Sequence, residues 1–426
     1  TPTTSQLKHS IHTDISHPST KLSHIMNQQQ ELVEIGRGNC GSVWARRLSE
    51  VDDDDSNNKT VIKREDCNRN RSVTKEYDIH KHILARLAAA TMASKSDSNL
   101  MTGYQVNIPT AIDFIDSTSP EWASLLPRLP KDFKPCKALN NERIPPMRQH
   151  VRQLLAQKYC GTGGRSGPPS EKLAADLLDA VMTEQNCLVR PFLGRRRLPR
   201  NRPRVISAVS FRNYPLHLDQ IEELGLPKEQ YAIAMADMLA FLHWEAEVDA
   251  RDVEFVLARP RQQQPASSLS SIGSKPLNPE GVFGPHAMWL LDFDCCKRLA
   301  IPGTMNDDDE KMQTEVAFLD HVAFCFWRND PFYPRPPPPG YDTNNGDGNS
   351  SNGDGSHASI SKSNYHPADV QLWKMFKERY LETSEEILEE RGKEEMVREL
   401  PGKVMDIIER TRGKNWFAFR DEGGVE

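Results

Sequence analysis

The stretch "ELVEIGRGNCGSVWA" (31–45) decides how the rest of the chain is interpreted. Its glycines Gly36, Gly38 and Gly41 follow the spacing G-x-G-x-x-G, and Val43 stands two residues after the last of them. Glycines at this spacing let a tight turn between two strands approach a phosphate group closely. The pattern alone is a weak signal, because ordinary hairpins also use glycine in their turns. Whether this turn holds phosphates therefore depends on the residues that follow it.

Two charged residues follow in an order that fits a phosphate-binding site. The segment "TVIKRE" (60–65) predicts a strand that carries Lys63, and a lysine there can reach the phosphates of a nucleotide. The next segment, 73–93, has the apolar spacing of a helix and carries Glu76 in its first turn. A carboxylate at that place can pair with Lys63 and hold it. Either residue alone is more often an ordinary surface charge.

Two later segments supply acidic residues at the ends of apolar patterns. In "VDARDVEFVLA" (248–258), Asp249 stands five residues before Glu254, where a strand pattern begins. In "MWLLDFDCC" (288–296), an apolar strand ends in Asp292. Phosphoryl transfer requires a carboxylate that orients the attacking hydroxyl and carboxylates that bind Mg²⁺. Both segments are therefore candidate parts of one such site.

The identities of these residues and their order along the chain resemble those of proteins with the protein-kinase-like fold. The resemblance implies an α+β, two-lobed protein with a small N-terminal lobe, made of an antiparallel sheet and one helix, and a larger, mainly helical C-terminal lobe. It implies ATP and Mg²⁺ as cofactors. The implied catalytic residues are Asp249, Lys63 and Glu76, and the implied metal ligands are Asp292 and Glu254. The implied nucleotide-binding residues are Gly36, Gly38, Gly41, Val43 and Lys63. The motif "LLDFD" (290–294) resembles the aminoglycoside and choline phosphotransferase branch of this fold more closely than the Ser/Thr kinases. That branch phosphorylates small-molecule hydroxyls.

Several positions depart from the kinase pattern. Glu247 and Val248 replace the His-Arg pair before the base, Glu254 replaces an asparagine, and Asp294 replaces the glycine of Asp-Phe-Gly. A glutamate at 254 can still coordinate Mg²⁺, but it adds negative charge beside the phosphates. Two functions therefore stay open. One is an ATP-dependent phosphotransferase acting on a hydroxyl of a small molecule or protein, and the other is a pseudokinase that serves as a nucleotide-binding or inert interaction scaffold.

Composition divides the chain into packed and low-complexity parts. We predict a single strand over 106–117 and two C-terminal helices over 366–382 and 384–398. Two segments rich in Pro, Gly, Ser or Asn are predicted to be disordered insertions. The predicted organisation is a disordered tail at 1–29, a small lobe at 30–145, a large lobe at 146–400 with insertions at 259–285 and 334–363, and a C-terminal tail at 401–426.

A second resemblance concerns motifs in the later part of the chain. They are similar to an uncharacterised fungal domain family that is often labelled zinc finger protein, and the similarity spans roughly residues 105–385. The motifs are "RNYPLHLDQIEELGL" (212–226), "DARDVEFVLA" (249–258), "WLLDFDCC" (289–296) and "RNDPFYPRP" (328–336). This resemblance implies a fungal source and no established activity. The eight cysteines form no C-x-x-C and no zinc-finger set, which predicts free thiols in a reducing compartment.

The charge and hydropathy of the chain limit the classes of partner that we expect for it. The 426 residues carry a net charge of −6, which argues against nucleic acid as a partner. No apolar run approaches the roughly 18 residues that a membrane span requires. The N-terminal stretch lacks an apolar signal core, so we expect an intracellular protein, cytoplasmic or nuclear, whose substrate or partner is an unknown small molecule or protein. The basic run "GRRRLPRNRPR" (194–204) is either a nuclear localisation signal or anion-binding site, or a solvated loop.

Overall fold

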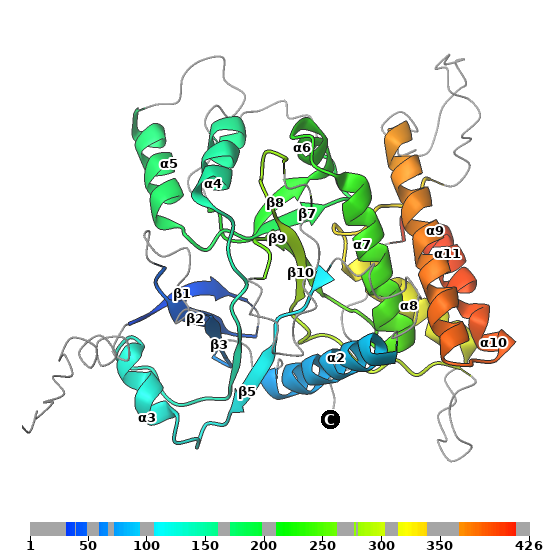
Figure 1. Cartoon of the computed structure of the whole chain (residues 1–426), viewed down its shortest axis with the longest axis horizontal. Helices are drawn as coiled ribbons and strands as arrows, with labels where there is room; N and C mark the ends of the chain where they lie inside the picture. The colour runs from blue at the N-terminus through cyan, green and yellow to red at the C-terminus, as the bar shows by residue number, and fades with distance from the viewer. Residues whose placement is uncertain are drawn as a thin grey trace, which may run out of the picture.

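The computed structural model of the chain mixes α-helices and β-strands (Figure 1). It describes residues 31–38, 40–48, 59–66, 72–93, 106–160, 171–197, 210–261, 277, 280–302, 314–338 and 366–414. The predicted tail at 1–29, residues 262–276 and 278–279 of the first predicted insertion and residues 339–363 of the second lie outside these residues.

The N-terminal part forms a five-stranded antiparallel sheet, as the sequence predicts. Its strand order is β1-β2-β3-β6-β5. The strands are β1 (Leu32–Arg37), β2 (Ser42–Arg46), β3 (Thr60–Arg64), β6 (Ala138–Glu142) and β5 (Ala111–Ile115). One face of the sheet, with Trp44 and Ile62 buried, packs against Trp122 of the short helix α3 (Trp122–Leu125) and against partly buried Leu126 of η1 (Leu126–Arg128). Helix α2 (Val73–Ala93) lies between this sheet and the helices of the C-terminal part (Figure 1).

A second five-stranded sheet, which the sequence does not predict, follows the first. Its order is β4-β10-β9-β7-β8, and it mixes parallel and antiparallel pairs. The strands are β4 (Val106–Asn107), β10 (Ala287–Leu291), β9 (Glu254–Ala258), β7 (Val189–Phe192) and β8 (Tyr214–His217). The prediction of one strand over 106–117 is wrong, because the segment divides at Pro109. Proline has no backbone N–H for a ladder, and the chain passes there from β4 in the second sheet to β5 in the first.

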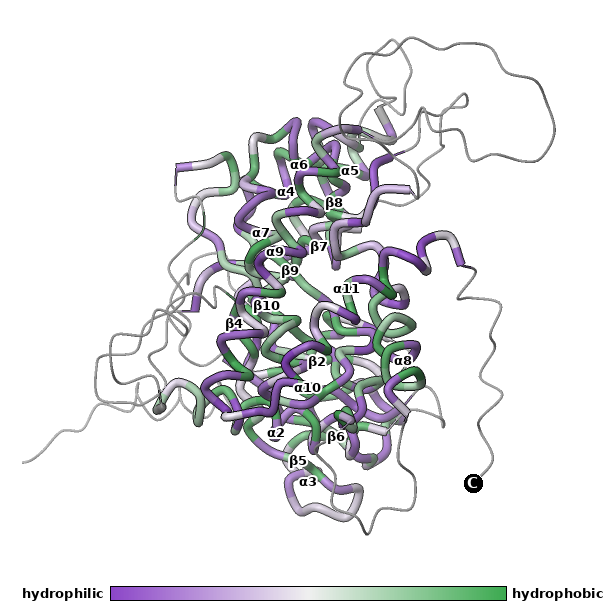
Figure 2. Tube along the Cα trace, turned by 90° about the vertical axis from the view of Figure 1, so that its right-hand side faces the viewer, coloured by the Kyte–Doolittle hydropathy of each residue, from purple (hydrophilic) through white to green (hydrophobic). Residues whose placement is uncertain are grey.

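Helices pack around the second sheet and contribute many of the buried apolar residues. Helix α7 (Lys228–Ala240) is buried along nearly its whole length and packs against α9 (Pro367–Glu390). Figure 2 shows hydrophobic and hydrophilic residues alternating along α8 (Glu315–Arg328) and α11 (Leu400–Arg410), as expected of helices with one buried face. The other helical segments are α4 (Gln149–Leu155), η2 (Ala156–Cys160), α5 (Glu171–Thr183), α6 (Leu218–Glu223), η3 (Phe241–Glu245) and α10 (Glu395–Arg398).

The two predicted C-terminal helices are one helix, α9, followed by the short α10. The expected break falls at Thr383 and Ser384, both buried. The Thr383 hydroxyl donates to Asp237 of α7 at 2.7 Å, and the Ser384 hydroxyl donates to the Tyr380 carbonyl one turn back at 2.5 Å. Both hydroxyls therefore find partners within an uninterrupted helix.

The ends of three predicted disordered or terminal segments are ordered. Helix α11 lies almost entirely in the predicted tail at 401–426, yet Val404, Met405 and Ile408 are buried in the main core. Arg261 pairs with Glu142 at 2.8 Å at the start of the predicted insertion 259–285. Arg335 pairs with Asp330 at the start of the predicted insertion 334–363.

Among the helices of the described residues, none combines the length and the apolar composition that a membrane span requires.

Candidate functional site

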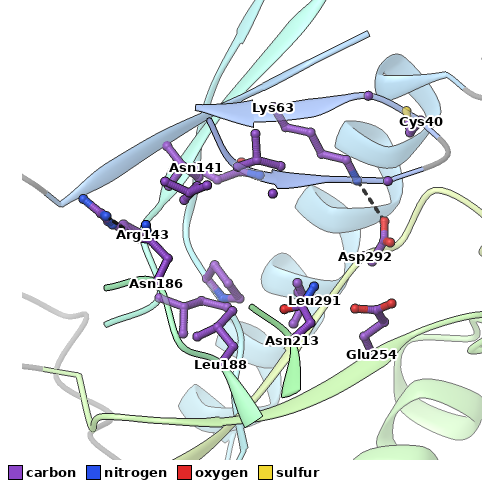
Figure 3. Close-up of a pocket in the computed structure, with 18 of the residues that line it drawn as sticks. Cys40, Lys63, Asn141, Arg143, Asn186, Leu188, Asn213, Glu254, Leu291 and Asp292 are labelled. Atoms are coloured by element: carbon purple, nitrogen blue, oxygen red, sulfur yellow. Dashed lines mark hydrogen bonds and ion pairs between the residues drawn. The ribbon is translucent and has the colours of Figure 1, made fainter. Parts of the chain in front are cut away.

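A cavity of about 210 Å³ lies between the two sheets (Figure 3). The glycine turn between β1 and β2 covers one end, β3 and α2 line one wall, and β9 and β10 line the other. Apolar side chains from both sheets and the segments beside them form much of its surface: Ile35, Val43, Val61, Ile144, Leu188 and Leu291. The cavity thus offers an apolar slot with a polar end.

Lys63 stands at the polar end and contacts two carboxylates. Its Nζ lies 2.8 Å from Oε1 of Glu76 in the first turn of α2 and 2.8 Å from Oδ1 of Asp292, which follows β10. Burial by itself lowers the pKa of Lys63, but the two carboxylates outweigh it and hold that pKa well above its ordinary value. Burial raises the pKa of Glu76 to about 7, against the opposing effect of Lys63. Three separate elements therefore converge on one ammonium group.

The glycine turn is closed by a hydrogen bond from the Gly38 N–H to the Gly41 carbonyl at 2.9 Å. A Cβ at Gly41 would stand 1.5 Å from the Arg64 carbonyl oxygen, so only glycine lets the turn pack on β3. A Cβ at Gly38 would meet nothing within 4 Å. Packing therefore requires the glycine at 41, whereas at 38 the missing side chain leaves the backbone accessible from the cavity.

Glu254 also faces the cavity, but it is paired with a cation. Its Oε2 lies 2.5 Å from Nη2 of Arg190 on β7. Burial raises the pKa of Glu254 to about 7, with Arg190 opposing this and Asp292 adding to it. Figure 3 shows the carboxylates of Glu254 and Asp292 at the same end of the cavity. Arg190 was not predicted, although an arginine inside the apolar pattern "CLVRPF" is an available signal.

Asp249 lies elsewhere. It is fully buried and does not line the cavity. Its Oδ1 accepts hydrogen bonds from the backbone N–H groups of Arg251 at 3.2 Å and Lys297 at 3.0 Å. Its Oδ2 accepts from Nε2 of His321 on α8 at 3.0 Å. The structure therefore places this predicted base where it joins three segments, away from the cavity.

The other predicted site residues do come together. Those that line the cavity are Gly36, Gly38, Gly41, Val43, Lys63, Glu76, Glu254 and Asp292. The opposite end has polar residues that were not predicted, among them Arg143, whose Nη1 donates to the Arg46 carbonyl at 2.8 Å and whose Nη2 donates to Oδ1 of Asn186 at 2.6 Å.

Left-handed backbone is concentrated near the cavity and around Asp249. Asp292 has a φ of 68°, and Glu247, Ala250 and Asp252 have φ values of 52°, 52° and 63°. Such values are strained for residues other than glycine and persist only where the surroundings enforce them. Asn329 provides part of that enforcement, because its amide group accepts from the Asp252 N–H at 2.5 Å and donates to the Ala250 carbonyl at 2.7 Å.

Comparison with known proteins gives one match. A family model described as zinc finger protein, a domain of unknown function, matches residues 288–347. The chain is similar to that family over this segment, which contains most of β10, Asp292 and α8. No curated protein and no solved structure matches the chain. The match is narrower than the span of 105–385 that the sequence motifs suggest.

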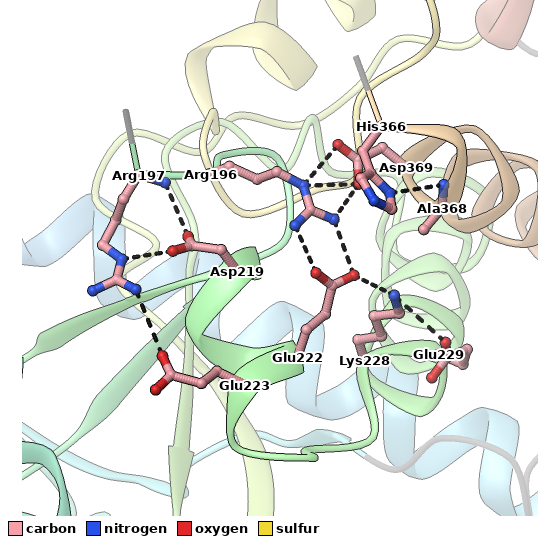
Figure 4. Close-up of polar contacts among 10 residues, drawn as sticks. All are labelled: Arg196, Arg197, Asp219, Glu222, Glu223, Lys228, Glu229, His366, Ala368 and Asp369. Carbon is pink, nitrogen blue, oxygen red and sulfur yellow. Dashed lines mark hydrogen bonds and ion pairs between the residues drawn. The ribbon is translucent and has the colours of Figure 1, made fainter. Parts of the chain in front are cut away.

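The arginines in the described part of the basic run, residues 194–197, are engaged in ion pairs, and Figure 4 shows those of Arg196 and Arg197. Arg196 lies between Glu222 of α6 and Asp369 of α9, with distances of 2.6 Å to both. Arg195 lies 2.7 Å from Asp330, and Arg197 lies 2.6 Å from Asp219. These three arginines therefore hold the segment after β7 to nearby segments, and their pairing with carboxylates favours neither an anion-binding site nor a fully solvated loop. Residues 198–204 of the run lie outside the described part.

Substitution of Arg196 by alanine is expected to lower the free energy of unfolding by about 1.5–3 kcal/mol, because both carboxylates would lose charged hydrogen bonds in a partly buried place. Arg197→Ala is the matched control. Arg197 is 43% exposed, so its loss should cost at most about 1 kcal/mol. Urea unfolding of both variants measures the difference. Equal stabilities for the two variants would contradict the role assigned to Arg196.

Proposed function

We propose that this chain is a kinase-like protein that binds an adenine-nucleotide-type ligand in the cavity and does not transfer phosphate efficiently. In this proposal, the first sheet with α2 and the helix-rich remainder are the two lobes of a kinase-like arrangement. The observation that carries it is the convergence of Lys63, Glu76 and Asp292 beneath the glycine turn. A lone ion pair is common in proteins, whereas a strand lysine paired with a helix glutamate beside a glycine turn is the arrangement that protein kinases use at the nucleotide phosphates.

The cavity matches the two chemical halves of a nucleotide. Its apolar slot suits a flat aromatic base, and its polar end offers Lys63, Arg190 and the backbone around Gly38 to phosphates. A Mg²⁺ ion has acceptable ligands here, because Asp292 and Glu254 each use one oxygen in an ion pair and keep another. When bound, Mg²⁺ would neutralise phosphate charge. The guanidinium group of Arg190 would also neutralise part of the phosphate charge. We therefore expect the nucleotide to bind without Mg²⁺ as well.

The position of Asp249 supports the pseudokinase alternative over the phosphotransferase. A catalytic base must come within hydrogen-bonding distance of the hydroxyl that attacks the phosphate. Asp249 is buried and hydrogen-bonded to three donors, and it does not line the cavity. The carboxylates that line the cavity are paired with Lys63, Arg190 or Arg261.

Calorimetric titration and thermal unfolding with ATP, ADP and AMP test nucleotide binding. Each should be measured with Mg²⁺ and with EDTA. Ligand at about 100 times its dissociation constant should stabilise the fold by roughly 2.7 kcal/mol. In EDTA, the affinity should fall as pH rises through about 7, because Glu254 then ionises and repels the phosphates. In EDTA, Glu254→Gln should reduce this dependence and strengthen binding at pH 8 by about tenfold. Glu76, whose pKa is also raised to about 7, should leave a residual dependence.

The outcomes separate the alternatives. Absence of binding at millimolar nucleotide, with and without Mg²⁺, would overturn the proposal and leave an inert scaffold. Steady turnover of ATP with any hydroxyl acceptor would instead support a phosphotransferase. Binding in EDTA whose pH dependence is as large in Glu254→Gln as in wild type would contradict the part assigned to Glu254.

A further inference from the structure

A second group of chemically reactive side chains lies away from the cavity, where the loop that contains Asp249 meets α8. The Nε2 of His321 lies 3.0 Å from Oδ2 of Asp249 and 3.6 Å from Sγ of Cys325. All three potential ligand atoms lie within 4.8 Å of one another. We propose that Asp249, His321 and Cys325 bind a zinc ion, with water as the fourth ligand.

The spacing of the three atoms fits a tetrahedral ion. Zinc binds nitrogen and oxygen at about 2.0–2.2 Å and sulfur at about 2.3 Å, so the edges of its tetrahedron are about 3.4 Å for oxygen to nitrogen and about 3.5 Å for nitrogen to sulfur. The two measured distances agree with these edges to within a few tenths of an ångström. His321 and Cys325 are four residues apart on α8 and therefore share one face of the helix.

Charge and burial also favour a divalent ion. Asp249 is fully buried and Cys325 is 1% exposed, so a buried carboxylate and, once the metal has displaced its proton, a buried thiolate would together balance the charge of a divalent ion. On binding, zinc would displace the thiol proton to solvent, and the imidazole would carry its remaining proton on Nδ1. The two backbone N–H groups that donate to Oδ1 of Asp249 already hold this carboxylate in orientation. The side chain of His321 is 32% exposed, which gives water and the ion access.

This site differs from a zinc finger. The segment matched by the zinc-finger-labelled family contains His321 and Cys325, but Asp249 comes from outside it. Three protein ligands with an open fourth position are typical of zinc that stays in contact with solvent. The inference does not rest on nucleotide binding, because none of the three residues lines the cavity.

Metal analysis of the purified full chain, with any histidine tag removed, tests the proposal. We expect one zinc ion per chain after incubation with ZnCl₂ and gel filtration, and none in His321→Ala or Cys325→Ser. Cys296→Ser is the matched control, because Cys296 is also buried nearby but its thiol donates to the Arg251 carbonyl at 3.3 Å. It should keep the zinc.

Cobalt substitution gives a second measurement that needs no variant. Co²⁺ bound here should show tetrahedral visible bands and a thiolate-to-cobalt charge-transfer band. Wild-type protein that takes up neither ion at a slight excess, or that binds Co²⁺ without the thiolate band, overturns the proposal. Zinc retained in folded His321→Ala and Cys325→Ser, with folding checked by circular dichroism, also overturns it.

Discussion

Lys63→Met is expected to lower the free energy of unfolding by about 3–5 kcal/mol at pH 8.5, because it removes one partner of a buried ion-pair group. Lys63 is the cation that both Glu76 and Asp292 contact at 2.8 Å. Glu76 is only 3% exposed, and its other oxygen, Oε2, is buried with no hydrogen-bond partner. Without Lys63, Glu76 must either remain charged in a buried place or bind a proton.

The loss of stability should depend on pH in a defined direction. The pKa of Glu76 is raised to about 7 in the folded chain from an ordinary value of 4.5. Stability from such a group is fully present below pH 4.5 and is lost as pH rises through about 7. Removing Lys63 raises this pKa further, since its effect lowers it. The difference between wild type and Lys63→Met should therefore be small near pH 5 and should grow toward pH 8.5.

Urea unfolding at pH 5 and at pH 8.5 measures this difference. Lys374→Met is the control, because Lys374 is 63% exposed and its pair with Glu378 spans 3.7 Å. The double variant Lys63→Met with Glu76→Gln should recover part of the stability at pH 8.5, since it leaves no buried carboxylate. Nucleotide binding should be absent in both Lys63 variants. A variant as stable as wild type at both pH values would contradict the burial of this group.

The cavity could be predicted from the sequence because its parts are local patterns. The glycine turn, the strand around Lys63 and the helix that begins before Glu76 are each recognisable within about ten residues. The antiparallel pairing of β9 with β10 places Glu254 opposite Leu291 and so brings Glu254 and Asp292 to the same cavity. The second sheet could not be predicted in this way, because β4 has two residues and pairs in parallel with β10 about 180 residues later. A two-residue strand has no periodicity to detect.

The direction in which the Asp249 side chain points also could not be predicted from the sequence. Its spacing from Glu254 matches the pattern of a base before a strand, but spacing does not fix where a side chain points. The left-handed backbone at Glu247 and Ala250 shapes the loop on both sides of it. Its partner His321 comes from α8, 72 residues later. The orientation of the Asp249 side chain therefore depends on contacts that form only in the folded chain.

Asp249→Ala is accordingly expected to lower the free energy of unfolding by about 3–5 kcal/mol, because it leaves buried donors without an acceptor. The donors are the N–H groups of Arg251 and Lys297 and the imidazole of His321. Asp249→Asn should cost less, about 1–2 kcal/mol, since its amide oxygen can still accept from the two backbone groups. Urea unfolding in EDTA measures both without any contribution from bound metal.

This pair of variants also separates a structural Asp249 from a catalytic one. A base that faces a cavity can be replaced with little loss of stability, and removing it often stabilises an enzyme. A buried carboxylate that joins three segments cannot. If Asp249→Ala is as stable as wild type, Asp249 is not held as described, and the phosphotransferase alternative regains its base. If Asp249→Ala is strongly destabilised while Asp249→Asn still binds nucleotide with unchanged affinity, the residue supports the fold and the cavity works without it.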